Sequence, residues 1–191
     1  MMNYLIIGLG NPGQEYELTR HNIAWECLDR YSKVRDAPWK SKFKGLFTSF
    51  DYQNKKFYVL KPQTYMNLSG ESVQSMMSFF KVPLENIIVL HDDIDLDFGL
   101  IVFKKGGGLA GHNGLKSISN LCGGSNFMRL RLGVGRPQHG SVSNWVLSKF
   151  TGDDLIILNS YFELVSRALD EFTSRGFERA SNKYSRKRVE E

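Results

Sequence analysis

Short apolar runs of strand length alternate along the chain with longer segments in which apolar residues recur every three or four positions. A short, mostly apolar or alternating run is typical of a β-strand, whereas recurrence at i, i+3, i+4 and i+7 indicates an amphipathic helix. The first pattern predicts strands over residues 4–8, 43–52, 56–60, 87–90, 100–104 and 126–135. The second predicts helices over residues 22–31, 69–80, 112–121, 141–147 and 153–172.

Two of the predicted helices have clear internal signals. Ser69 is suited to cap the first of them, because a serine oxygen can accept a hydrogen bond from a free N–H of the first turn. Glu71 lies in that turn, where the helix dipole favours an acid. Each helix also has one apolar face, formed by Val73, Met76, Met77 and Phe80 in the first and by Leu155, Leu158, Phe162, Val165 and Leu169 in the second.

The alternation of strands and helices predicts an α/β sandwich around a mixed sheet. Such sheets bind ligands beyond the carboxyl ends of their strands. Three predicted strands run at that end into polar loops, with the sequences GLGNPG, KPQTYMNLSG and HDDIDLD. We therefore expect these three loops to converge on one edge of the sheet.

The composition is that of an ordinary globular protein, with 41% hydrophobic and 24% charged residues in a chain of 191. No shift in composition marks a linker, so we expect one domain over residues 1–191. Two cysteines, Cys27 and Cys122, are too few for a disulfide framework, and no stretch has the pattern of a signal peptide or a membrane span. These features predict a cytoplasmic protein without a membrane partner.

The net charge of +5 and the pI of about 9.2 favour a polyanionic partner. Lys104 and Lys105 precede a glycine cluster, and Arg129, Arg131 and Arg136 fall within one short stretch. The tail over residues 175–191 has six Lys or Arg against three Glu, hence a charge of +3. A solvated helix end would also explain the charge of the tail.

The first glycine cluster has the G-x-G-x-x-G spacing of a dinucleotide-binding turn, in Gly8, Gly10 and Gly13. In such a fold the helix begins inside the glycine pattern, so that its amino terminus meets the pyrophosphate. Here Pro12 lies within the pattern, and the nine mostly polar residues after the pattern, QEYELTRHN, lack an apolar helical stripe. The alternative is a tight turn that presents the side-chain amide of Asn11 to the crevice.

Asparagines occur in three comparable settings, as Asn11 in GNPG, Asn67 in TYMNLSG and Asn113 in GHNG. An amide group can donate a hydrogen bond to a carbonyl oxygen that becomes negative in the transition state, and one such donor is typically worth about 10²- to 10³-fold in rate. Each of the three could also be an ordinary turn residue. Their shared position at predicted strand or helix ends favours a role in a site.

Histidines and carboxylates supply the remaining candidates. Four acids, Asp92, Asp93, Asp95 and Asp97, follow His91, and such a cluster invites comparison with a metal site. The zinc and calcium ligand patterns are missing, so no metal is expected. The competing interpretation is a His–Asp pair in which the carboxylate orients the imidazole. G-x-S-x-G is missing as well, which favours water as the nucleophile.

Phosphate and base contacts are also conceivable. The glycines between Lys104 and Gly114 could form a lip that brings backbone amides and Lys104 or Lys105 near phosphates, although the Walker order is not met. Three aromatic residues could stack on bases, namely Tyr16, Tyr65 and Phe127.

Five long motifs occur in order: GLGNPGxxYxxTRHN, KPxTYMNxSGxSV, HDDIDL, GGGxxGHNGLKSI and FxRLRxGVGRP. Together they resemble the bacterial-type peptidyl-tRNA hydrolases over about residues 5–150, whereas the tail matches only in length and basic character. The resemblance implies a three-layer α/β/α sandwich around a mixed, mostly parallel twisted sheet. It also implies a monomer without a cofactor that cleaves the ester between a peptide and the 3′ end of tRNA, and so recycles tRNA from stalled translation.

The resemblance further implies a role for individual residues. His21 would be the general base, Asp92 its orienting partner, and Asn11 a ligand of the peptide that helps to recognise a blocked α-amino group. Asn67 and Asn113 would position the ester and the attacking water. The remaining implied contacts are Tyr16 and Tyr65 beside the terminal adenosine and Lys104 and Arg131 at phosphates.

The chain departs from the family pattern at Ala24 and Ala110, where glycine is usual, and at Val102, where some members have lysine. None of these is an implied catalytic residue, but they bear on the strength of tRNA binding. Two other classes of protein stay open: a nucleotide-dependent oxidoreductase and an RNA-binding protein without catalytic activity.

Overall fold

The computed structural model describes residues 1–189 and contains one mixed sheet of eight strands in the order β2-β3-β4-β1-β5-β7-β6-β8. The four central strands, β4, β1, β5 and β7, are parallel to one another. Strands β3 and β6 pair antiparallel with both of their neighbours and so run against the other six strands. The mixed, mostly parallel sheet is thereby confirmed. The strands are β1 Met2–Gly8, β2 Lys40–Lys42, β3 Gly45–Tyr52, β4 Lys55–Pro62, β5 Ile87–Asp93, β6 Leu100–Lys105, β7 Met128–Gly133 and β8 Lys187–Arg188.

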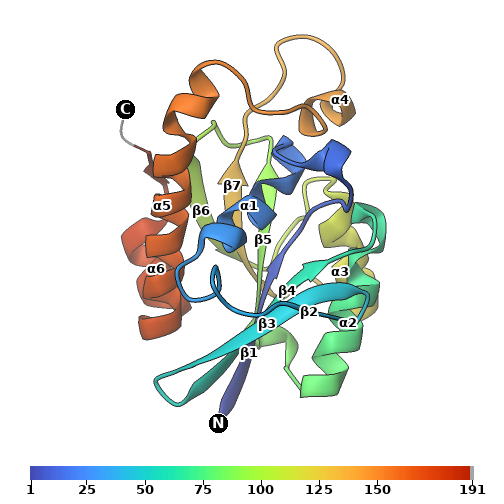
Figure 1. Cartoon of the computed structure of the whole chain (residues 1–191), viewed down its shortest axis with the longest axis vertical. Helices are drawn as coiled ribbons and strands as arrows, with labels where there is room; N and C mark the ends of the chain where they lie inside the picture. Colours follow the sequence, from blue (N-terminus) through green and yellow to red (C-terminus); the bar gives the residue numbers. More distant parts are fainter. Residues whose placement is uncertain (190–191) are drawn as a thin grey trace.

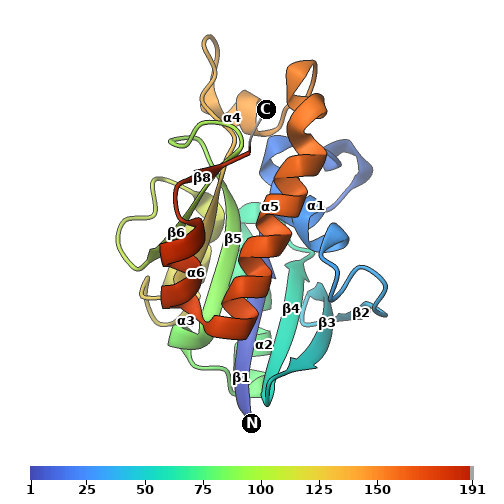
Figure 2. The same ribbon diagram turned by 90° about the vertical axis from the view of Figure 1, so that its left-hand side faces the viewer.

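Helices cover both faces of the sheet, which gives three layers (Figures 1 and 2). On one face α1, α5 and α6 enclose a core, and on the other face α2 and α3 enclose a second. The helices are α1 Ile23–Arg30, α2 Ser69–Phe80, α3 Asn113–Cys122, α4 Val142–Val146, α5 Asp153–Arg175 and α6 Phe177–Tyr184, and the short 3₁₀ turns are η1 Gln14–Tyr16, η2 Arg20–Asn22, η3 Met66–Leu68 and η4 Leu84–Asn86.

Strand β5 shows why the central strands appear as continuous apolar runs in the sequence. Its side chains alternate between the two cores, with Ile88 and Leu90 in one and Ile87 and Val89 in the other. A strand that is covered on both faces needs apolar residues at every position rather than at every second one. The polar residues that follow, His91 to Asp93, form the carboxyl end of the same strand and are buried as well.

Several local predictions are corrected by the structure. Ser69 is the first residue of α2 and not its cap, because Leu68 is at the cap position and the Ser69 hydroxyl donates to the Met66 carbonyl oxygen at 2.8 Å. Leu155 is 52% exposed, whereas the other four residues predicted on its face are buried. The tail forms α6 and an edge strand, β8, instead of a solvated helix end, although its last two residues lie outside the described part.

Helices α2 and α3 are in close contact at Gly70. A Cβ atom at this position would lie 2.2 Å from the Ser117 carbonyl oxygen, and the Gly70 N–H donates to the Ser117 hydroxyl at 2.9 Å. Gly70→Ala should therefore push the helices apart and lower the free energy of unfolding by about 1–3 kcal/mol, despite the better helix propensity of alanine. Chemical denaturation measures this. Gln74→Ala, at an exposed position of the same helix, is the control, and an unchanged midpoint for Gly70→Ala would contradict the close contact.

Candidate active site

A cleft of about 430 Å³ lies beyond the carboxyl ends of the parallel strands. Its lining comes from the loop after β1, the turns η2 and η3, the end of β5, the loop before α3, and α4. The three polar loops that were expected to converge all contribute to it, with Asn11, with residues 65–67 and with residues 91–94. The predicted convergence of the three loops on one edge of the sheet is confirmed.

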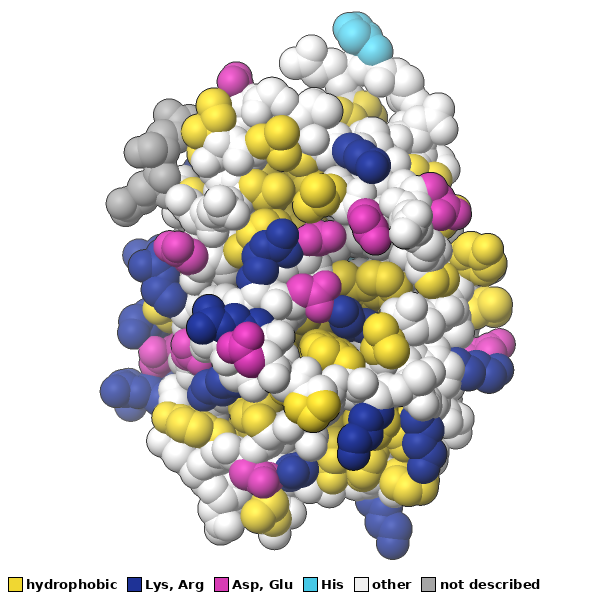
Figure 3. Space-filling model, in the orientation of Figure 1, with side chains coloured by type: hydrophobic (Ala, Val, Ile, Leu, Met, Phe, Trp, Pro, Cys, Tyr) yellow, Lys and Arg dark blue, Asp and Glu magenta, His cyan; other side chains and the backbone are white. Residues whose placement is uncertain are grey.

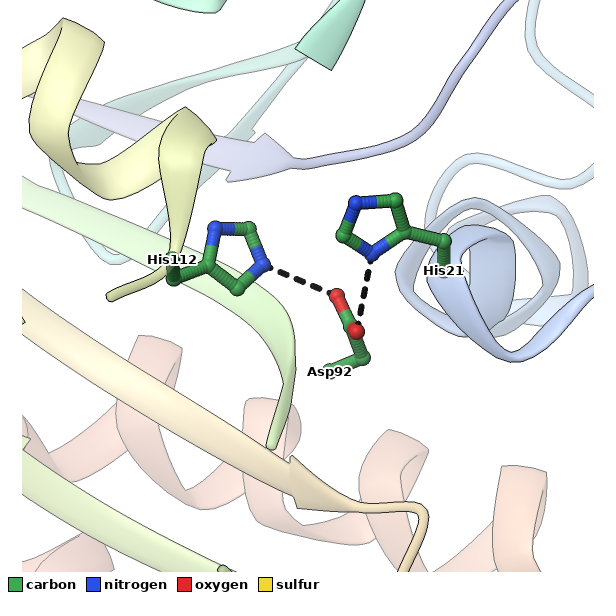
Figure 4. A group of neighbouring side chains, drawn as sticks. All are labelled: His21, Asp92 and His112. Carbon is green, nitrogen blue, oxygen red and sulfur yellow. Dashed lines mark hydrogen bonds and ion pairs between the residues drawn. The ribbon is translucent and has the colours of Figure 1, made fainter. Parts of the chain in front are cut away.

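His21 and Asp92 form a hydrogen-bonded pair in this cleft (Figure 4). The Nδ1 atom of His21 lies 2.8 Å from Oδ2 of Asp92, a buried carboxylate in β5. A carboxylate only accepts hydrogen bonds, so Nδ1 carries the proton and donates it. The other ring nitrogen, Nε2, then has a lone pair, as a general base requires.

His112 binds the second oxygen of the same carboxylate, which the sequence analysis did not predict. Its Nε2 lies 2.9 Å from Oδ1 of Asp92 (Figure 4). Its Nδ1 accepts hydrogen bonds from the backbone N–H groups of Gly114 and Leu115 and so caps α3. Because Nδ1 accepts, the N–H group that points to Asp92 is on Nε2. The only sequence signal for this role was the position of His112 at the start of a predicted helix.

The electrostatics of the pair favour a charged Asp92 and a readily protonated His21. Burial alone disfavours both charged forms. For Asp92, however, the interactions with His21 and His112, including a hydrogen bond from each ring, outweigh burial and hold the pKa of the carboxyl well below its usual range. For His21, burial lowers the pKa, but the charge and hydrogen bond of Asp92 more than compensate, so the pKa is raised.

The same three side chains, His21, Asp92 and His112, are the group within residues 1–189 with atoms close enough to consider as metal ligands. Both imidazoles, however, direct N–H groups at different oxygens of the carboxylate, and the carboxylate lies between them (Figure 4). A metal would need the lone pairs of these nitrogens at one point. The arrangement fits a hydrogen-bonded group of three side chains better than a metal centre.

The other acids of the HDDIDLD loop pair with arginines that are distant in sequence. Asp93 accepts from Arg131 at 2.7 Å and Asp95 from Arg136 at 2.5 Å, while Asp97 pairs with Arg188. Burial raises the pKa of Asp93, but the hydrogen bond from Arg131 outweighs it and the pKa is lowered. The acidic cluster that invited a metal interpretation thus consists of ion pairs.

Asn11 is held so that its amide N–H groups are available to a ligand. The side-chain oxygen accepts from the Met66 N–H at 2.8 Å, which fixes the orientation of the amide. The Asn22 side chain clamps the Asn11 backbone, accepting from its N–H at 2.8 Å and donating to its carbonyl at 2.9 Å. The sequence analysis missed Asn22 as a positioning residue, although it directly follows His21.

Removing the Asn22 clamp should affect both stability and rate. Asn22→Ala leaves two buried backbone groups without partners, which costs about 1–3 kcal/mol for each unsatisfied group. A displacement of Asn11 by about 1 Å would lower kcat/KM by roughly 10²-fold. Denaturation and steady-state kinetics check the two effects. Asn120→Ala, at an exposed position of α3, should change neither, and wild-type kinetics for Asn22→Ala would contradict the clamp.

The glycines of the first cluster are explained by packing rather than by a nucleotide. A Cβ on Gly10 would lie 2.6 Å from the Trp25 ring, and one on Gly8 would lie 2.6 Å from a methyl group of Leu28. Gly13 has a positive φ of 119°. Helix α1 begins only at Ile23, after two 3₁₀ turns, so no helix terminus faces the glycine pattern as a dinucleotide turn requires.

The remaining predicted residues divide into two groups. Tyr65, Asn67 and Asn113 line the cleft with exposed side chains. Tyr16, Lys104 and Arg131 do not line it.

Two other residues that the sequence analysis discussed, Phe127 and Ala110, also differ from what was expected of them. Phe127 is fully buried, so the suggestion that it stacks on a base is wrong. Ala110, one of the departures from the family pattern, does line the cleft and has a positive φ of 50°. An alanine is strained there where glycine is not.

The site thus combines a hydrogen-bonded His–Asp pair with carboxamide side chains in one cleft at the strand ends of an α/β sandwich, which is compatible with hydrolysis. The sequence profile of the peptidyl-tRNA hydrolase family matches residues 5–191, and the chain belongs to this family of ester hydrolases. Within residues 1–189, no helix combines the length and apolar character needed to cross a membrane.

Relatives and a solved structure agree with this assignment. The peptidyl-tRNA hydrolase of Geotalea uraniireducens (strain Rf4) is 42% identical over 186 residues, which cover 97% of each chain. That of Clostridium novyi (strain NT) is 43% identical over 183 residues, covering 95% of this chain and 97% of the relative. The crystal structure of peptidyl-tRNA hydrolase from Acinetobacter baumannii superposes with a TM-score of 0.90 at 32% identity, covering 100% of this chain and 99% of that one.

Proposed function

We propose that the chain hydrolyses the ester between a peptide, or an N-blocked aminoacyl group, and the 3′ end of tRNA, with His21 as the general base. The observation that carries this proposal is the 2.8 Å hydrogen bond from His21 Nδ1 to Asp92, which leaves Nε2 as an acceptor in the cleft. Family membership supplies the substrate class, and the geometry supplies a base for water.

In the proposed reaction, Nε2 of His21 takes a proton from water as the water oxygen attacks the ester carbonyl. Asp92 stabilises the imidazolium that forms and keeps its orientation. Carboxamide N–H groups hydrogen-bond the developing oxyanion, each worth about 10²- to 10³-fold in rate. When the ester C–O bond breaks, the imidazolium returns the proton to the leaving ribose oxygen, which departs as a hydroxyl group.

Other residues take the parts that the family resemblance implies. Asn11 binds the peptide and helps to distinguish a blocked from a free α-amino group, while Asn67 and Asn113 position the ester and the water. Tyr65, exposed in the cleft, lies beside the terminal adenosine with Tyr16 further out. Lys104 and Arg131 then contact phosphates outside the cleft.

The proposal extends to the setting of the reaction. A single domain acts as a cytoplasmic monomer without a cofactor and recycles tRNA from stalled or aborted translation. On the face shown in Figure 3, lysines and arginines alternate with acidic side chains instead of forming one basic patch.

Release of peptide from N-blocked aminoacyl-tRNA, measured with a chelator present, tests the proposal. Turnover under these conditions is expected. Binding of tRNA without turnover would instead indicate an RNA-binding protein. A rise in melting temperature with NAD or FAD would favour a nucleotide-dependent oxidoreductase.

The pH dependence of the rate follows from the raised pKa of His21. The base works only when neutral, so kcat/KM should be low below that pKa, rise as the pH passes through it, and level off above it. Because Asp92 raises the pKa, the midpoint should lie above the reference value of about 6.5. A pH–rate profile between about 5 and 9 measures this, and a flat profile would contradict a histidine base.

A further inference from the structure

Helix α4 forms one wall of the cleft but contributes no side chain to the core. Val142, Ser143, Val146 and Leu147 line the cleft, and none of the five helix residues is buried. A segment without buried apolar contacts has low local stability unless other contacts hold it. Polar contacts must therefore set the position of this wall relative to the catalytic histidine.

Arg20, the residue before His21, supplies most of these contacts. Its guanidinium is almost fully buried, with the residue 4% exposed. Nη1 donates to the Ser148 hydroxyl and to the Lys149 carbonyl oxygen, both at 2.8 Å, and Nη2 donates to Asp154 at 2.8 Å. One side chain thus joins the turn η2 to the end of α4 and to the start of α5.

The contact continues into α4 and the backbone. The guanidinium carbon of Arg20 lies 3.7 Å from the centre of the Trp145 ring, and the Trp145 N–H donates to the Gly135 carbonyl oxygen at 2.8 Å. The Arg20 N–H donates to the Ser148 carbonyl oxygen at 3.0 Å. Only a planar group with several donors can stack on the ring and form these hydrogen bonds at once.

From this geometry we infer that Arg20 is a positioning residue, which fixes the α4 wall of the substrate cleft relative to His21. This inference rests on the proposed function, because it concerns the substrate of the same cleft. Arg20 touches no reacting atom in this arrangement. Its effect is on substrate binding: when α4 is displaced, the wall is lost while the His21–Asp92 hydrogen bond persists.

Arg20→Lys tests the inference, since lysine keeps the charge but cannot replace the planar contacts. In steady-state kinetics with N-blocked aminoacyl-tRNA, KM should rise. The rise is about tenfold if only a tenth of the molecules hold α4 in place, because the apparent dissociation constant is the intrinsic one divided by the fraction of binding-competent molecules. The value of kcat and the midpoint of the pH–rate profile should change little. Arg30→Lys, a more exposed arginine of α1, is the matched control and should leave KM unchanged.

A second measurement is independent of activity. Hydrogen exchange of the backbone amides in residues 141–150 should become faster in Arg20→Lys and stay unchanged in Arg30→Lys, whereas exchange in β5 should be alike in all variants. If Arg20→Lys does not fold, Asp154→Asn, which weakens one of the contacts, should show the same pattern to a smaller extent.

Two results would overturn the inference. One is an unchanged KM for the folded enzyme together with only a lower melting temperature, which would indicate a purely structural role. The other is unchanged exchange in residues 141–150. An inactive wild-type enzyme would refute the proposed function instead, and the exchange measurement would still decide the role of Arg20.

Discussion

Replacing His21 by alanine is expected to lower kcat by about 10²- to 10⁴-fold, the usual worth of a general base, while the fold is kept. Nε2 of the His21 imidazole is available to take a proton from water, because Nδ1 is committed to Asp92 at 2.8 Å. Single-turnover release of peptide from N-blocked aminoacyl-tRNA measures the effect on the chemical step.

His139→Ala is the matched control for this variant, because His139 is exposed in the loop before α4 and does not line the cleft. It should retain wild-type kcat. The residual rate of His21→Ala should also lose the rise with pH, since the titrating base is gone. Near-normal turnover by a correctly folded His21→Ala would show that another group activates the water.

The central part of the fold could be predicted because its strands are covered on both faces. A short continuous apolar run such as Ile87 to Leu90 is typical of a strand that is buried on both faces. The short edge strands could not be predicted in this way. Strand β2 consists of three exposed lysine and serine residues, and β8 consists of two basic residues, so neither has a hydrophobic pattern. These strands are defined only by their backbone pairing with β3 and β6.

The site was predictable to the extent that its residues lie in sequence motifs. His21 and Asn11 come from the first motif and Asp92 from the third, and the structure brings all three residues into one cleft. His112 and Asn22 were missed because their roles depend on hydrogen-bond geometry. The imidazole of His112 faces both a carboxylate and a helix terminus, and Asn22 binds only backbone atoms. Nothing in residue type or spacing distinguishes these roles from ordinary ones.

The hydrogen-bond pattern around Asp92 makes an amide a poor substitute for the carboxylate. Asp92 accepts from His21 through one oxygen and from His112 through the other. An asparagine has one accepting oxygen and one donating NH₂ group. If the NH₂ faces His21, then Nδ1 must become the acceptor and the proton moves to Nε2. If it faces His112, two donors meet, because Nδ1 of His112 already accepts from the α3 backbone.

Asp92→Asn is therefore expected to lower kcat by about 10⁴-fold, the size of effect seen when the acid of a hydrolase triad becomes an amide and the histidine takes the wrong tautomer. The loss of the negative charge should also lower the pKa of His21, because burial then acts without opposition. Kinetics and an NMR titration of the His21 ring measure the two effects together.

Asp95→Asn, at a carboxylate that pairs with Arg136, is the control and should retain both the rate and the pKa of His21. A decrease in kcat without any change in the His21 titration would mean that Asp92 acts on the substrate and not through the imidazole.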